Sequence, residues 1–97
     1  MRNLTKSEKL AVKDQFDFQI GGILNLIDDM GLEAANIKTV EDAKHIADNV
    51  AHILLKEMRN SNTEICFTST ELNKFINKLK ITATAELEDA IRYELAH

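Results

Sequence analysis

The sequence contains no proline and no tryptophan, and its three glycines are confined to positions 21, 22 and 31. Proline interrupts helices because it lacks a backbone N–H and clashes with the preceding turn, so a chain without it can form long helices. Glycine in a helix interior costs about 1 kcal/mol relative to alanine. The Gly21-Gly22 pair is therefore the main internal position at which we expect a long helix to bend.

The chain has a single cysteine, Cys66, so it cannot form an internal disulfide, which agrees with a reducing compartment. Cys66 lies between Ile65 and Phe67, where we expect a small buried residue rather than a reactive thiol. No apolar run approaches the roughly 20 residues of a membrane span. The N-terminus turns polar where a signal peptide has its apolar core. These features predict a cytoplasmic protein that does not enter a membrane.

Basic residues are too few and too scattered for a typical nucleic-acid-binding surface. The net charge is −4, and the bases include one group at the N-terminus and another at Lys74, Lys78 and Lys80. Because phosphate contacts supply most of the affinity for nucleic acids, this pattern disfavours DNA or RNA as a partner. With 97 residues, 44% hydrophobic and 29% charged, the composition predicts one soluble domain over residues 1–97.

Three capping boxes divide the chain into helical segments. In each, a threonine is followed three residues later by an acid, and the two side chains can satisfy each other's backbone N–H groups at a helix start. The pairs are Thr5 with Glu8, Thr39 with Asp42, and Thr68 with Glu71. In the third box Phe67 and Leu72 are also placed for a hydrophobic staple.

Apolar residues then recur every three or four positions, as on one face of a helix. They predict helices from about Lys6 to Met30, from Val40 to about Arg59, and from Ser69 onward, with Gly31 as a left-handed C-cap. The predicted core residues are Val12, Phe16, Ile20, Ile23, Ile27 and Met30, then Val40, Ala43, Ala47, Val50, Leu54 and Met58, and finally Leu72, Phe75, Ile76, Leu79, Ala83, Leu87 and Ala90. Residues 64–67 are short and β-prone, and we expect them to be extended.

The fold predicted from these segments is all-α, a small antiparallel bundle of three long helices. The weak helix formers at 81–84, with bases before them and acids after, allow a break that would give four helices. No glycine or proline marks a turn there, so a continuous or kinked third helix is slightly favoured.

The sequence contains one polar cluster with potential for chemistry, formed by Glu41, His45, Asp48 and His52. These residues form two i,i+4 pairs of a carboxylate and an imidazole, which are metal-ligand types. The cluster faces away from the apolar stripe of its own helix, whereas metal sites in bundles use inward side chains from several helices. We therefore interpret it as a solvated face, and we expect no metal, no cofactor and no catalytic residues.

Two surfaces are candidates for binding a protein partner. Phe18 lies on the side of its helix away from the core stripe, and it either anchors an interface or is turned into the core by a bend at the glycine pair. The second surface is acidic, with Asp28, Asp29 and Glu33 joined by three acids of the next helix, Glu41, Asp42 and Asp48. Such a patch can attract a basic protein surface, although acids in a first helical turn also stabilise that helix by themselves.

These observations predict a small non-catalytic protein that acts by binding another protein, as inhibitors, immunity proteins, adaptors and phage or mobile-element regulators do. The predicted site residues are Phe18, Asp28, Asp29 and Glu33, and the predicted partner has a basic surface. The alternative is a helical homo-oligomer, such as a homodimer, with a structural role. A nucleic-acid-binding protein is the less favoured third hypothesis.

Overall fold

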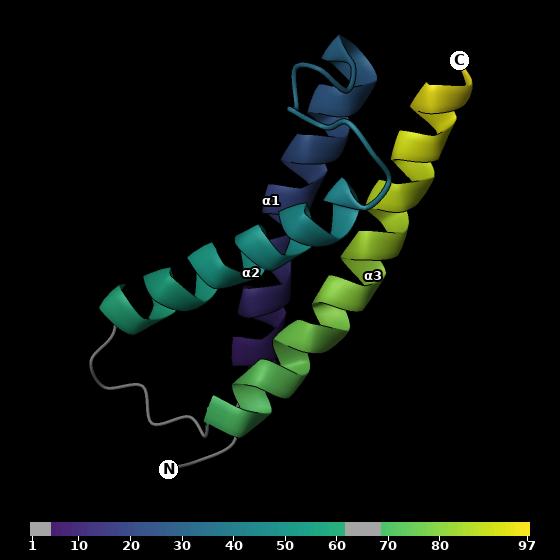
Figure 1. Ribbon diagram of the computed structural model, residues 1–97. Helices are drawn as coiled ribbons and strands as arrows, with labels where there is room; N and C mark the ends of the chain where they lie inside the picture. Colours follow the sequence, from purple (N-terminus) through teal and green to yellow (C-terminus); the bar gives the residue numbers. More distant parts are fainter. Residues whose placement is uncertain (1–4, 62–68) are drawn as a thin grey trace.

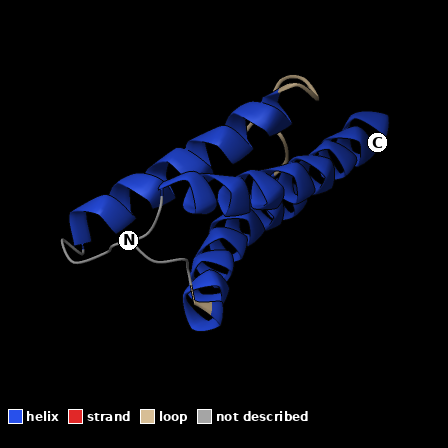
Figure 2. Cartoon of the chain, turned by 90° about the horizontal axis from the view of Figure 1, so that it is seen from below, coloured by secondary structure: helices blue, strands red, loops and turns tan. Residues whose placement is uncertain are grey.

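The computed structural model describes residues 5–61 and 69–97, and within these ranges it contains three helices and no strand. The helices are α1 (Lys6–Met30), α2 (Asp42–Ser61) and α3 (Ser69–Ala96). α1 and α3 lie side by side and run in the same direction, while α2 runs back obliquely across them (Figure 1). Figure 2 shows the same arrangement from below. The predicted all-α bundle of three long helices is confirmed.

α1 begins and ends at the residues that the sequence predicts. Its capping box is complete, because the Glu8 N–H donates to Thr5 Oγ1 at 3.2 Å and the Thr5 N–H donates to Glu8 Oε1 at 2.9 Å. At the other end the Gly31 N–H donates to the Ile27 carbonyl at 2.9 Å. Gly31 has the expected positive φ of 87°, but its ψ of 176° is extended rather than left-handed helical. Such a conformation is almost restricted to glycine.

α2 begins two residues later than predicted, at Asp42. The Asp42 carboxylate accepts the N–H groups of Lys38 at 2.7 Å and Thr39 at 3.0 Å, so the acid of the second box does reach back to its cap. The chain between Thr39 and Lys44 is held by i+3 bonds, and this tight turn precedes the regular helix. α2 then runs to Ser61, slightly past the predicted end.

α3 begins at Ser69 as predicted and continues without interruption through residues 81–84 to Ala96. In that stretch Ala83 is buried in the core, which holds the weak helix formers in helical conformation. The alternative of four helices is therefore wrong. The third capping box at Thr68, its staple residue Phe67 and the predicted extended segment 64–67 with Cys66 all lie outside the described residues.

The core follows the predicted stripes, with instructive differences. The buried residues are Val12, Phe16, Ile20, Ile27, Ile37, Ala43, Ala47, Val50, Ala51, Leu54, Ile76, Ala83, Leu87 and Ile91. Ile37 comes from the connection between α1 and α2, where its side chain anchors the turn. Met30 was expected in the core but is 69% exposed, because it occupies the last turn of α1.

Candidate functional site

The most conspicuous surface feature is Phe18 in the middle of α1, which is 75% exposed. The residues two before and two after it, Phe16 and Ile20, are buried. Two residues correspond to about 200° around a helix, so burying Phe16 and Ile20 turns Phe18 to the outside. α1 continues unbroken through the Gly21-Gly22 pair. The alternative in which a bend there turns Phe18 into the core is therefore wrong.

Phe18 belongs to a row of exposed residues that we call the outer face of α1. Its members recur at three- or four-residue intervals along almost the whole helix, and they are Ala11, Asp14, Phe18, Gly22, Asn25 and Asp29. Gly22 leaves open space, because a Cβ placed there would meet no atom within 4 Å. The ring of Phe18 therefore projects from a surface of small and short polar side chains, with an acid toward each end.

The predicted acidic site residues do not form a single patch with Phe18. Asp29 lies on the outer face of α1, about 16 Å along the axis from Phe18 at 1.5 Å per residue. Asp28 is the next residue around the helix, about 100° away, on the flank nearer α3. Glu33 is exposed in the turn after α1, where its carbonyl accepts the Asn36 N–H at 3.0 Å. Only Asp29 thus shares a face with Phe18.

Two other acids of the predicted patch are engaged within the fold. The pKa of Asp42 is lowered, first by the hydrogen bond from the Lys38 N–H and then by that from the Thr39 N–H. The pKa of Asp48 is also lowered, chiefly by the hydrogen bond from the Lys80 side chain on α3, whose Nζ lies 2.9 Å from Oδ1. Both carboxylates are engaged in contacts within the fold, so they contribute less to an open acidic surface than the sequence suggests.

The cluster of Glu41, His45, Asp48 and His52 is dispersed by the same ion pair. Asp48 turns toward α3, while the other three side chains are exposed to solvent. In residues 5–61 and 69–97, no group of three or more His, Cys, Asp or Glu side chains is placed to hold a metal ion.

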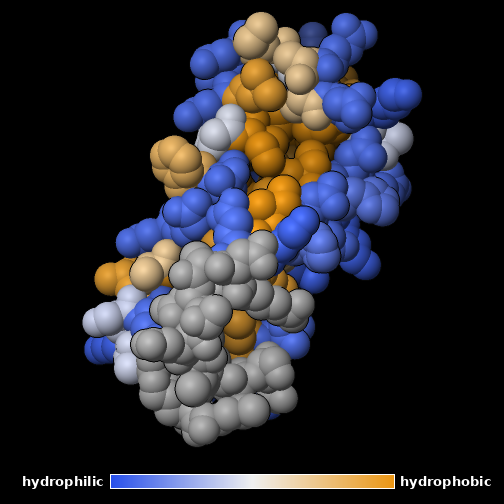
Figure 3. Space-filling model, turned by 90° about the vertical axis from the view of Figure 1, so that its left-hand side faces the viewer, coloured by the Kyte–Doolittle hydropathy of each residue, from blue (hydrophilic) through white to orange (hydrophobic). Residues whose placement is uncertain are grey.

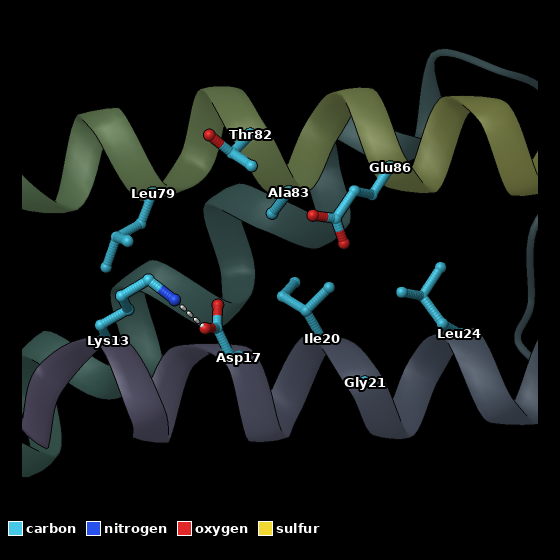
Figure 4. Close-up of a pocket in the computed structure, with 9 residues that line it drawn as sticks. All are labelled: Lys13, Asp17, Ile20, Gly21, Leu24, Leu79, Thr82, Ala83 and Glu86. Atoms are coloured by element: carbon cyan, nitrogen blue, oxygen red, sulfur yellow. Dashed lines mark hydrogen bonds and ion pairs between the residues drawn. The ribbon is translucent and has the colours of Figure 1, made fainter. Parts of the chain in front are cut away.

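A groove that the sequence analysis missed lies between α1 and α3. It has a volume of about 280 Å³ and an apolar floor formed by Ile20, Leu24, Leu79 and Ala83. Figure 4 shows these side chains pointing into the gap, with the Lys13–Asp17 pair at one end and Glu86 across from α1. The Lys13 ammonium lies 2.6 Å from the Asp17 carboxylate, and this hydrogen bond raises the pKa of Lys13. The groove was missed because sequence periodicity does not reveal that α1 and α3 are neighbours.

The seam between α1 and α2 is almost closed. Its cavity of about 10 Å³, between Gln15 and Gln19 of α1 and Val50 and Ile53 of α2, has room for about one water molecule. The groove between α1 and α3 is the larger of these two cavities.

A stripe of apolar side chains reaches the surface on the side of the molecule that Figure 3 shows, bordered by hydrophilic ones.

Comparisons with known proteins do not assign the chain to a group: no family model matches it, and no curated protein and no solved structure matches it. None of the helices, as far as the structure describes them, is long and apolar enough to cross a membrane.

Proposed function

We propose that this chain is a non-catalytic protein that acts by binding another protein through the outer face of α1, with Phe18 as the anchor. The observation that carries the proposal is the 75% exposure of Phe18 at the centre of a helix whose opposite side packs into the core. Burying a phenylalanine side chain contributes roughly 1.5–3 kcal/mol. In the free protein that contribution is not realised.

The neighbours of Phe18 favour a protein partner. Aromatic anchors that fill a pocket on the other side dominate many interfaces, and the contacts around them mainly exclude water. Gly22 and Ala11 leave room for a partner's backbone to approach the ring. This arrangement suits a partner that presents an apolar pocket.

The charges of the outer face indicate what surrounds that pocket. Asp14 and Asp29 lie on either side of Phe18, and both are exposed. Electrostatic complementarity then favours a partner whose pocket has a basic rim, and this attraction accelerates association and weakens at high salt. The same acids disfavour a nucleic acid on this face.

The proposal is tested by affinity capture from the native host with quantitative mass spectrometry, comparing wild type with Phe18→Ser. The matched control is Ile81→Ser, which removes a similarly exposed apolar side chain (73%) from the middle of α3. We expect a protein recovered with wild type and Ile81→Ser but at least tenfold depleted with Phe18→Ser. With the purified partner, Kd should rise about 30-fold or more for Phe18→Ser, the effect of losing a central anchor worth about 2 kcal/mol.

Equal recovery by wild type and Phe18→Ser contradicts the proposal. Recovery of this chain alone, with a mass at multiples of 11.0 kDa that collapses in Phe18→Ser, favours the second candidate, a homo-oligomer with a structural role. The melting temperature of Phe18→Ser should stay close to that of wild type, since the side chain is exposed.

A further inference from the structure

We propose that a second copy of this chain docks on the face formed by α1 and α3, antiparallel to the first, about a two-fold axis near Gly21. The inference is independent of the proposed function, because it concerns a different face of the bundle. We call this surface the α1–α3 face. It is the side of the groove away from α2, which lies behind the gap in Figure 4.

The register of the two helices defines which residues share a height on this face. The ion pair between Lys9 Nζ and Glu71 Oε1, at 3.4 Å, joins the first turns of the parallel helices. The difference in residue number between neighbouring positions of α1 and α3 stays about the same farther along the helices, since Ile20 and Ala83 both line the groove. With the same rise per residue in both helices, Tyr93 lies at about the height of Gly31, and Asp89 at about that of Ile27.

Charges on the α1–α3 face are of opposite sign at its two ends. The start of α1 carries Lys6, Lys9 and Lys13 around an open hollow of about 410 Å³. Glu71 and Asp17 offset part of this positive charge through their ion pairs with Lys9 and Lys13. The other end carries Asp28, Glu86 and Asp89, all exposed, and Arg92 offsets part of this negative charge through its ion pair with Asp89 at 3.8 Å.

A two-fold axis across the face makes this polarity self-complementary. In an isologous dimer the same patch meets itself in reverse, so the basic end of one copy faces the acidic end of the other at two equivalent places. Reflected about Gly21, Lys13 falls near Asp28, and the long side chain of Lys9 reaches toward Asp89. A parallel arrangement would instead place like charges together, which is unfavourable.

The same two-fold axis brings two exposed apolar side chains opposite each other. Leu10 is 59% exposed and Tyr93 is 61% exposed. Leu10 lies fourteen positions before Leu24, and Tyr93 lies fourteen positions after Leu79. Fourteen residues make about four helical turns. Leu10 is therefore on the same side of α1 as the groove residue Leu24, and Tyr93 is on the same side of α3 as the groove residue Leu79. The two lie about 15 Å on either side of Gly21 at 1.5 Å per residue. In the dimer, Leu10 of each copy covers Tyr93 of the other.

The centre of the face is built for close approach. A Cβ at Gly21 would meet no atom within 4 Å of its own chain, so packing inside the protomer does not require glycine there. Glycine also weakens a helix interior. A helix of the second copy crossing at Gly21 accounts for a residue that the isolated bundle does not need.

The available area matches what a stable dimer uses. α1 has 25 residues, which gives a length of about 37 Å at 1.5 Å per residue. The molecule is 20 Å wide in its second dimension. The α1–α3 face thus covers on the order of 700 Å², close to the roughly 800 Å² per partner of a standard interface.

Paired charge reversals test the orientation directly. The variants are K9E/K13E, which makes both ends acidic, and D28K/D89K, which makes both ends basic. By sedimentation velocity the wild type should be a dimer that weakens with added NaCl, and each variant alone should lose affinity at least 30-fold through like-charge contacts. An equimolar mixture should recover a 1:1 heterodimer, because both contacts are then attractive.

Gly21→Leu supplies a second measurement with a matched control, Gly22→Leu, whose side chain points about 100° away. We expect Gly21→Leu to weaken the dimer at least tenfold and Gly22→Leu to leave it unchanged. Circular dichroism verifies that each variant is folded. If a charge variant fails to fold, the comparison of Gly21→Leu with Gly22→Leu tests the proposal.

A wild type that stays monomeric up to 1 mM overturns the proposal. So does a mixture of folded charge variants that stays monomeric, or an equal effect of the two leucine substitutions. Phe18→Ser should leave this dimer intact, and Gly21→Leu should leave capture of a different protein intact, so the two proposals fail separately.

Discussion

The Asp48 carboxylate of α2 lies 2.9 Å from the Lys80 ammonium of α3, and this ion pair joins the two helices that pack most extensively on each other. Both side chains are partly exposed, at 43% and 31%. The pair takes one acid out of the polar cluster on α2. It also links a residue of the predicted acidic patch to one of the few basic residues of α3.

A double-mutant cycle with Asp48→Asn and Lys80→Met should give a coupling free energy of about 0.2–1 kcal/mol, the range for exposed pairs. The coupling should shrink at 0.5 M NaCl because salt screens exposed charges. Urea unfolding of the four proteins measures it. A coupling of zero at low salt would show that the pair does not hold the helices together.

The lowered pKa of Asp42 predicts a loss of stability in acid. A carboxylate whose folded pKa is depressed stabilises the fold above its unfolded pKa, near 3.8, and the contribution disappears as pH falls through the lower, folded value. Wild type should therefore lose free energy of unfolding as pH falls below about 5. Asp42→Asn should show a shallower decline between about pH 5 and pH 2, measured by urea unfolding at each pH.

The control for this experiment is Asp29→Asn, which removes the same charge from an exposed position on α1. The decline in acid should be shallower for Asp42→Asn than for Asp29→Asn, because only Asp42→Asn changes the side chain that accepts the Lys38 and Thr39 N–H groups. Identical curves for Asp42→Asn and Asp29→Asn would contradict the role of the Lys38 and Thr39 hydrogen bonds.

Gly31→Ala and Gly21→Ala should change stability in opposite directions. At Gly31 the backbone has φ 87° and ψ 176°, a conformation that costs a residue with a Cβ roughly 1–3 kcal/mol. At Gly21 the backbone is helical and the space is open, so alanine should stabilise by about 0.5–1 kcal/mol. Thermal and urea unfolding of both variants measure the difference, and a stabilising Gly31→Ala would refute the strained cap.

Leu87→Ala should be among the most damaging substitutions in α3. Leu87 is fully buried, at 0% exposure, in the core between the three helices. Leucine-to-alanine changes at such sites cost about 2–5 kcal/mol, a large part of the stability of a domain this size. Leu95→Ala, at a 56% exposed position of the same helix, should cost under about 0.5 kcal/mol. Similar losses for both would mean that α3 is not packed as described.

Residues at helix starts show how far local sequence reasoning extends. Thr5 and Glu8 form the complete box that their spacing predicts, because both partners lie within one turn of the same chain. Asp42 also reaches back as expected, yet the turn before it delays the regular start of α2. Local hydrogen bonds are therefore predictable, while the exact boundary depends on how the connection packs.

The candidate site was only partly predictable. The 3.6-residue period already placed Phe18 opposite the core stripe, but periodicity does not say whether a helix bends at two glycines. Asp28 and Asp29 are adjacent in sequence and look like one patch, yet the helix separates them by about 100°. Ile37 carried no periodic signal, because it lies in a connection rather than in a helix.

The sequence by itself determined the three helices, the capping box of α1, the Asp42 contacts at the start of α2 and most of the buried faces, because these depend on contacts within a few residues. Only the tertiary structure decided that α3 continues through residues 81–84, that Asp48 pairs with Lys80, and that α1 and α3 enclose a groove with Gly21 at its rim. These features depend on which helices become neighbours and in what register. The neighbours and the register of the helices follow from burying the apolar stripes of all three helices at once. No single stretch of the sequence specifies this arrangement.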